Sequence, residues 1–237
     1  MANLASTYYK LGKYTEAEKL EIQVLNARNG IFGVEHPDTI TAMANLASTY
    51  QYMGKYMEAI KLKMQVLDAR NTRLGVEHPD TILAMENLAV TYHGQGKYTE
   101  AETLEIEVLD ARTRIFGVEH PETSRSMANL AATYQNLEKY AEAEKLQIQV
   151  LNARNKFFGV EHPDTITAMA NLASIYQYMG KYKEAEELDS QVLDARDRLL
   201  GVKHPDTITA MGNLASAYRN LGKYTEAEKL DIQPWLI

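Results

Sequence analysis

Apolar residues recur along this chain at the spacing of amphipathic helices, in stretches that are separated by short polar connectors. One stretch runs from Pro37 to Gly54 and has its apolar residues at Met43, Leu46, Ala47 and Tyr50. The next stretch starts near Tyr56 and stops before Gly75, with apolar residues at Ala59, Leu62, Val66 and Ala69. Spacings of three and four residues place side chains on one face of a helix. The pattern therefore predicts a pair of helices, each with one buried face.

The connectors carry residues that begin and end helices. Pro37 suits the first position of a helix, where its missing N–H is not needed, and Asp38 follows near the positive end of the helix dipole. Gly54 suits the left-handed conformation that ends many helices. All prolines except Pro234 lie at the same kind of junction, so none of those five interrupts a predicted helix. Pro234 is expected to stop the last helix.

The helix pair repeats with a constant period of 42 residues. The dipeptide Asn-Leu marks each first helix, with asparagine at Asn3, Asn45, Asn87, Asn129, Asn171 and Asn213. The junctions carry His-Pro, at His36-Pro37, His78-Pro79, His120-Pro121, His162-Pro163 and His204-Pro205. A helix pair has no core of its own, so each copy must pack its apolar face on its neighbours. We predict a single all-α solenoid domain over residues 1–237, with about five and a half repeats of antiparallel helix pairs.

Composition excludes several classes of function. The net charge of −7 argues against nucleic acid as a partner, because that binding relies on a concentrated basic face. The chain has no cysteine, which removes disulfides and thiolate chemistry and suits a reducing compartment. No apolar run approaches the roughly 20 residues of a membrane span, and the N-terminus does not resemble a signal peptide. We therefore expect a soluble cytoplasmic protein that has no membrane partner.

The titratable residues predict structural roles. Five histidines spaced 42 residues apart are too widely separated to bind one metal ion, so we expect them to cap or join helices. Glu16 and Glu18 belong to a solvated acidic face. The sequence contains no phosphate loop, nucleophile elbow or metal-ligand spacing, and we expect no enzyme activity, no metal and no cofactor. Late in the second helices lie arginines with an expected structural or ion-pair role, namely Arg28, Arg70, Arg112, Arg154 and Arg196.

The copies differ from one another at several positions of the first helix that are not on its predicted buried face. After Pro37 these positions are Thr41, Ala44, Ser48, Gln51 and Tyr52, whose spacing places them on one side of the helix. A fixed core with one varied stripe is typical of a recognition surface, although drift on an exposed face would look the same, and second-helix positions such as Lys61 vary too. We predict that this variable stripe contacts a ligand through Tyr9, Gln51, Tyr52, Glu86, His93, Arg125, Gln135, Gln177, Tyr178 and Arg219.

The repeated asparagine flanks the variable stripe. An extended peptide presents alternating N–H and C=O groups, and a carboxamide can donate and accept at the same time. A row of asparagines could therefore hold a peptide backbone without reading its sequence. The alternative is that each asparagine bonds a helix of the adjacent copy and never meets a ligand.

These residues resemble the tetratricopeptide repeat (TPR). Its small-large-small signature corresponds to Leu46-Ala47, Tyr50, Gly54, Tyr56 and Ala59 and their equivalents in the other copies. A common TPR unit has about 34 residues, whereas the period of 42 and the Leu-Gly-Val-Glu-His-Pro-Asp connector are similar to the kinesin light chain subtype, which also forms sensor arrays of fungal NOD-like (STAND) receptors. The resemblance implies a right-handed superhelix whose first helices line a concave peptide-binding groove. It also implies that the repeated asparagine contacts the bound peptide.

Taken together, these features predict a scaffold that binds a protein or an extended peptide. Met1 aligns with Met43, so the first helix lacks its opening turn, and neither end shows the polar capping helix that repeat arrays normally need. The chain is therefore expected to be a segment of a longer protein or to have apolar ends that find partners. One alternative function is end-to-end self-assembly. The other, implied by the resemblance, is the ligand-sensing arm of a larger signalling ATPase.

Overall fold

The computed structural model describes residues 1–232, and all regular structure in that range is α-helical, in twelve helices. The predicted all-α class is therefore confirmed, while Pro234 lies outside the described residues. The first helices of the pairs are α1 (Ala2–Lys10), α3 (Pro37–Tyr52), α5 (Pro79–Gly94), α7 (Pro121–Asn136), α9 (Pro163–Tyr178) and α11 (Pro205–Asn220). The second helices are α2 (Tyr14–Phe32), α4 (Tyr56–Leu74), α6 (Tyr98–Phe116), α8 (Tyr140–Phe158), α10 (Tyr182–Leu200) and α12 (Tyr224–Ile232).

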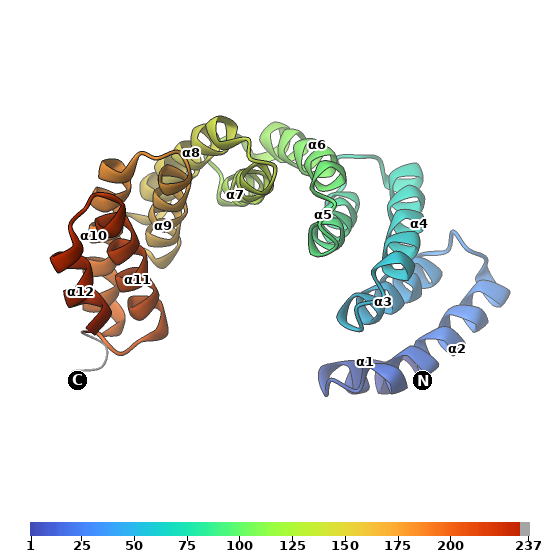
Figure 1. Ribbon diagram of the computed structural model, residues 1–237. Helices are drawn as coiled ribbons and strands as arrows, with labels where there is room; N and C mark the ends of the chain where they lie inside the picture. The colour runs from blue at the N-terminus through green and yellow to red at the C-terminus, as the bar shows by residue number, and fades with distance from the viewer. Residues whose placement is uncertain (233–237) are drawn as a thin grey trace. The chain divides into compact units, whose positions relative to one another are not determined.

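Contacts divide the chain into two compact units, Met1–Ala111 and Arg112–Ile237, the second of which is described as far as Ile232. Within the first unit each helix from α1 to α5 packs on the next one, and within the second unit the same succession runs from α7 to α12. In each unit the first helices lie on one side and the second helices on the other (Figure 1). That residues 1–237 form a single domain stays a prediction.

The histidine of each junction caps the first helix that follows it. The Nδ1 atom of His36 accepts a hydrogen bond of 3.2 Å from the backbone N–H of Asp38, and Pro37 occupies the first turn of α3. The same bond recurs at the start of α5, α7, α9 and α11. At three junctions a phenylalanine ring stacks on the imidazole, with ring centroids 4.4–4.6 Å apart. The capping role predicted for these histidines is confirmed.

An arginine in each complete second helix ties that helix to the first helix of the next repeat. The guanidinium of Arg28 donates to the backbone carbonyl of Asp38 at 2.8 Å. The equivalent arginines make the same bond, at 2.9 Å for Arg70, 3.4 Å for Arg112, 2.9 Å for Arg154 and 3.0 Å for Arg196. The expected structural role is therefore confirmed, and the recurrent partner is a backbone carbonyl. Because the bond joins fixed points on two helices, it sets the register between neighbouring repeats.

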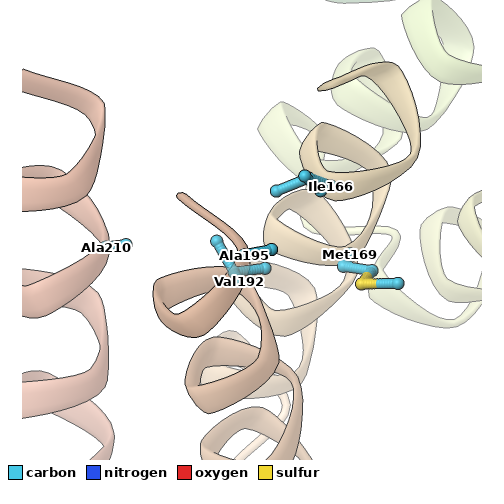
Figure 2. Close-up of a cluster of buried hydrophobic side chains, with 5 residues drawn as sticks. All are labelled: Ile166, Met169, Val192, Ala195 and Ala210. Carbon is cyan, nitrogen blue, oxygen red and sulfur yellow. The ribbon is translucent and has the colours of Figure 1, made fainter. Parts of the chain in front are cut away.

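Apolar residues from three successive helices meet in each buried cluster. In the first unit Ile40 and Met43 of α3 contact Val66 of α4 and Ala84 of α5. Figure 2 shows the equivalent cluster of the second unit, which α9, α10 and α11 form from Ile166, Met169, Val192, Ala195 and Ala210. In both clusters the third helix belongs to the following repeat. The core is therefore shared between neighbours, as the repeat pattern predicts.

The turn between the two helices of a pair uses a left-handed backbone. Gly54 has a φ of 74° and Gly180 a φ of 73°, which glycine adopts without steric cost. Glu138 occupies the equivalent position between α7 and α8 with a φ of 59°, and within residues 1–232 no other non-glycine residue has a positive φ. This conformation costs a residue with a side chain about 1–2 kcal/mol. The turn at Glu138 is therefore strained.

Replacing Glu138 with glycine should raise the free energy of unfolding by about 1 kcal/mol, because the strain is removed at some cost in unfolded-chain entropy. The reverse change, Gly180→Ala, should lower it by a similar amount. A Cβ added at Gly180 would meet no atom within 4 Å, so that variant reports on the backbone alone. Urea unfolding followed by circular dichroism measures both effects, and unchanged midpoints for both variants would contradict the account of the turn.

Candidate functional site

Six asparagines occupy the same position in successive first helices, and we call them the asparagine column: Asn3, Asn45 and Asn87 in the first unit, and Asn129, Asn171 and Asn213 in the second. All are exposed except Asn213, which is half-buried. Among residues 1–232 no hydrogen bond involves their carboxamides. The alternative in which each carboxamide bonds a neighbouring helix is therefore wrong. That the column binds a ligand stays a prediction.

The second helices carry a polar residue at a position that helical spacing assigns to their buried face. In α4 this residue is Lys63, which follows Ala59 by four positions and precedes Val66 by three. We call the six equivalent residues the polar column: Glu21, Lys63, Glu105, Gln147, Asp189 and Asp231. Glu21, Lys63, Gln147 and Asp189 are buried. This column was not predicted from the sequence, although a charged residue at apolar spacing is a visible signal.

Lys63 shows how the first unit accommodates a buried charge. Its ammonium donates to the side-chain oxygen of Gln51 in α3. It also donates to the carbonyl of Asn87 at 2.9 Å and to the hydroxyl of Thr91 at 2.6 Å, both in α5. Burial lowers the pKa of Lys63 from 10.5 to about 8, because desolvation disfavours the charged form. One ammonium group therefore joins α4 to helices of two repeats.

Asp189 plays the corresponding part in the second unit. Its carboxylate accepts a hydrogen bond of 2.9 Å from the amide of Gln177, which also donates to the carbonyl of Asn213 at 3.3 Å. Burial raises the pKa of Asp189 to about 6, although the hydrogen bond from Gln177 and the charge of Arg196 act in the opposite direction. The carboxyl group is therefore held in a site that favours its neutral form.

Three residues of the variable stripe each contact the residue of the polar column in the same repeat. Gln51 bonds Lys63, Gln177 bonds Asp189, and Arg219 forms an ion pair with Asp231 at 3.1 Å. The two members of each pair lie 12 residues apart. These three stripe residues therefore have partners within the chain, which neither ligand recognition nor drift on an exposed face had suggested. Their direct contact with a ligand stays a prediction.

The remaining predicted stripe residues differ in their surroundings. The amide of Gln135 donates to the hydroxyl of Ser174 at 3.1 Å. Arg125 is exposed and pairs with Glu122 at 2.7 Å. Glu86 and His93 are half-buried, and the imidazole of His93 lies edge-on to a tyrosine ring. The side chains of Gln135 and Arg125 are thus already engaged within the second unit.

Tyrosines of the variable stripe pack with tyrosines of the second helices in two groups, each of which has one exposed ring. In the first unit the ring of Tyr52 lies 5.4 Å from that of Tyr9 and stacks on that of Tyr14 at 5.5 Å. In the second unit Tyr178 stacks on Tyr140 with ring centroids 5.6 Å apart. Tyr52 is 63% exposed and Tyr178 is 64% exposed. These rings provide large, rigid contact surfaces that are not covered by the chain itself.

A pocket of about 320 Å³ lies between α1 and α3, with residues of α2 forming its third wall. Two residues predicted from the sequence, Tyr9 and Asn45, line this pocket. The buried Glu21 of the polar column lines it as well. Its volume falls at the lower end of the range of about 300–1,000 Å³ that is usual for small-ligand sites. Tyr9 of the variable stripe, Glu21 of the polar column and Asn45 of the asparagine column therefore line the same cavity.

No three histidine or carboxylate side chains of residues 1–232 come close enough together to hold a metal ion. None of the helices in this part of the chain combines the length and the apolar character that a membrane span requires.

The sequence profile of the tetratricopeptide repeat matches residues 1–72, 44–113, 80–156, 126–198 and 164–231, which together cover nearly the whole chain. The chain belongs to the tetratricopeptide repeat family. Among solved structures it is similar to nearly identical TPR-like repeats of a kinesin light chain protein from Podosopora anserina. That structure is 31% identical, with a TM-score of 0.77 over 84% of this chain and 94% of the other. Among curated proteins no match was found.

More distant structures share the solenoid fold. BtubC from P. vanneervenii is 19% identical, with a TM-score of 0.76 over 94% of this chain and 89% of the other. A STAND ATPase with a tetratricopeptide repeat sensor, from Pyrococcus horikoshii, is 17% identical with a TM-score of 0.73, and the match covers 99% of this chain but 35% of that protein. At these identities the likeness concerns the fold alone. The resemblance to kinesin-light-chain-type repeats that the connector suggested is confirmed.

Asp189→Asn should stabilise the chain at neutral pH by on the order of 2 kcal/mol. The pKa of Asp189 is raised to about 6 in the folded state, so its ionisation lowers the free energy of unfolding. This destabilisation is absent at pH values below the ordinary value of 3.8 and complete above pH 6. The stability difference between variant and parent should therefore be largest above pH 6 and should vanish towards pH 4. Urea unfolding across this pH range measures it.

Asp194→Asn on the same helix is the matched control, because Asp194 is exposed. A pH-independent difference for Asp189→Asn, or an equal effect in the control, would contradict the account of the buried carboxyl group.

Proposed function

We propose that this chain is a scaffold that binds a protein or an extended peptide on the exposed side of its first helices. The observation that carries the proposal is the asparagine column, in which six equivalent carboxamides make no hydrogen bond within the described residues. Membership of the tetratricopeptide repeat family supports the proposal, because scaffolds of this fold typically bind proteins. No enzyme activity is proposed.

The chemistry of the column suits a peptide backbone. Each carboxamide supplies one acceptor and two donors, so an extended strand can be bonded through its own N–H and C=O groups. A net hydrogen bond contributes about 0.5–1.5 kcal/mol, and several in one row reach a useful affinity. The exposed rings of Tyr52 and Tyr178 add apolar contact area beside the column. Binding would therefore depend on backbone contacts first and on side chains second.

The absence of cysteine agrees with the cytoplasm as the place of action, which is part of the proposal. The net charge of −7 agrees with a protein partner and not with nucleic acid.

A second candidate is the ligand-sensing arm of a larger signalling ATPase. It is favoured by the fold likeness to the STAND protein, in which the matched part makes up 35% of the chain. In that case the peptide-binding face would be the same, and the nucleotide-binding module would lie in another part of the protein. End-to-end self-assembly also stays a prediction, and a molar mass that rises with concentration in light scattering would support it.

Replacing both Asn129 and Asn171, which lie in the second unit, with alanine should weaken peptide binding at least about tenfold, because up to four backbone hydrogen bonds are lost. The probe is a blocked peptide selected from a random library against the intact chain, and fluorescence polarisation measures its dissociation constant.

The matched control replaces Asn71 and Asn155, two exposed asparagines of the second helices, with alanine. This control should leave affinity unchanged, and both double variants should keep the parent's thermal melt. Equal binding by the Asn129/Asn171 variant, or failure to select any peptide, would refute the proposed face.

A further inference from the structure

Glu21 of the polar column lines the pocket between α1 and α3, and one oxygen of its buried carboxylate has no donor. Glu21 is only 7% exposed, and its Oε2 atom has no hydrogen-bond partner. Lys63, at the same repeat position, donates to three oxygen atoms, and the carboxylate of Asp189 accepts from Gln177. A buried carboxylate without a partner is costly, so a donor that reaches it gains more than an ordinary hydrogen bond.

The surroundings of Glu21 favour a positively charged partner. Burial raises the pKa of Glu21, and the charge of Glu18 raises it further, whereas the hydroxyl of Thr49 lowers it. Burial also raises the pKa of Tyr9 to about 12, with contributions from Tyr52, Tyr14 and the charge of Glu21. Burial is the largest cause of both shifts and nearby acidic groups add to them, so an additional positive charge beside these two side chains would be favoured.

The basic residues of the pocket do not supply that cation. Arg28 lines the pocket, but its guanidinium already donates to the carbonyl of Asp38 at 2.8 Å. Lys10 lines the rim and is exposed. Neither of them is among the groups that shift the pKa of Glu21.

The oxygen atoms around the cavity are suited to an ammonium group. Besides Glu21, the pocket is lined by Ser6 and Ser48, which carry hydroxyls, and by Asn45, which carries a carboxamide. The ring of Tyr9 adds an aromatic surface, which attracts cations through its quadrupole. Lys63 of the next repeat shows that an ammonium at this depth is held by an amide, a hydroxyl and a carbonyl oxygen. The first repeat offers similar oxygens together with a carboxylate.

We propose that the pocket between α1 and α3 binds the ammonium or guanidinium group of a lysine or arginine side chain in a bound peptide. The occupant follows from Asn45, which belongs both to the asparagine column and to the pocket wall. A peptide held along the column passes the mouth of the cavity and can insert one long basic side chain. The choice of a peptide as the source of the cation rests on the proposed function, whereas the cation site itself does not.

The test uses the full chain, its Glu21→Gln variant and Glu16→Gln as the matched control, since Glu16 is exposed on the same helix. The first probe is n-butylammonium chloride at up to about 10 mM, followed by NMR shifts of the Asn45 side chain and the Tyr9 ring. The second probe is a pair of blocked peptides that differ only in one residue, lysine or norleucine.

Butylammonium should shift the pocket signals in the parent and in Glu16→Gln, and should shift them at least about tenfold less strongly in Glu21→Gln. The lysine peptide should bind the parent at least about tenfold more tightly than the norleucine peptide, and Glu21→Gln should abolish this preference. Glu21→Gln should melt no lower than the parent, because it removes an unpaired buried charge, which separates lost binding from lost folding.

The outcomes are distinguishable. If butylammonium leaves the pocket signals unchanged, or if Glu21→Gln binds it as well as the parent does, the cation site is refuted whatever the peptides do. If butylammonium binds through Glu21 but the lysine and norleucine peptides bind equally, the pocket serves small amines and the peptide source is refuted. If the lysine preference survives in Glu21→Gln, another carboxylate is responsible and the assignment to Glu21 is wrong.

Discussion

The shared core between neighbouring repeats is the constraint on which the rest of the structure depends. A pair of helices in this chain cannot cover its apolar face by itself, and Ala84 and Ala210 complete clusters that belong mainly to the preceding repeat. Stability therefore arises between repeats as much as within them. The arginine bond to the next repeat's backbone and the histidine cap hold each interface in one register. Each first helix buries one face in these clusters, and its opposite side stays free for other contacts.

The shared interior also contains polar groups, and the hydrogen-bond partners of these groups differ from repeat to repeat. Lys63 is satisfied by neutral oxygens of two neighbouring helices, while Asp189 depends on a single amide and keeps a raised pKa. A buried charge requires a specific partner across the interface, so repeats of nearly identical sequence are not interchangeable at these positions. Glu21 differs from Lys63 and Asp189 in the same way, because one of its carboxylate oxygens has no donor in the chain. The repeats of this array therefore differ from one another in the polar column as well as at their exposed positions.

Helix bounds, caps and repeat period could be predicted because they depend on local signals. Pro37, Gly54 and the spacing of Met43 and Val66 act within one or two turns of helix, and the structure matches them. The partners of the variable stripe could not be predicted in the same way, because Gln177 and Asp189 meet only after the helix pair has folded. Lys63 was overlooked because a charged residue was assumed to be solvated. The strain at Glu138 was equally hidden, since only the equivalent glycines reveal what its backbone must do.

The most direct test of the central claim, that the first helices form the ligand-binding side, is a crystal structure of the full chain with a selected peptide bound. The account predicts an extended peptide whose backbone is hydrogen-bonded to at least two carboxamides of the asparagine column, with the second helices uncovered. A peptide seated on the second helices, or on the first helices without any contact to the column, would contradict it.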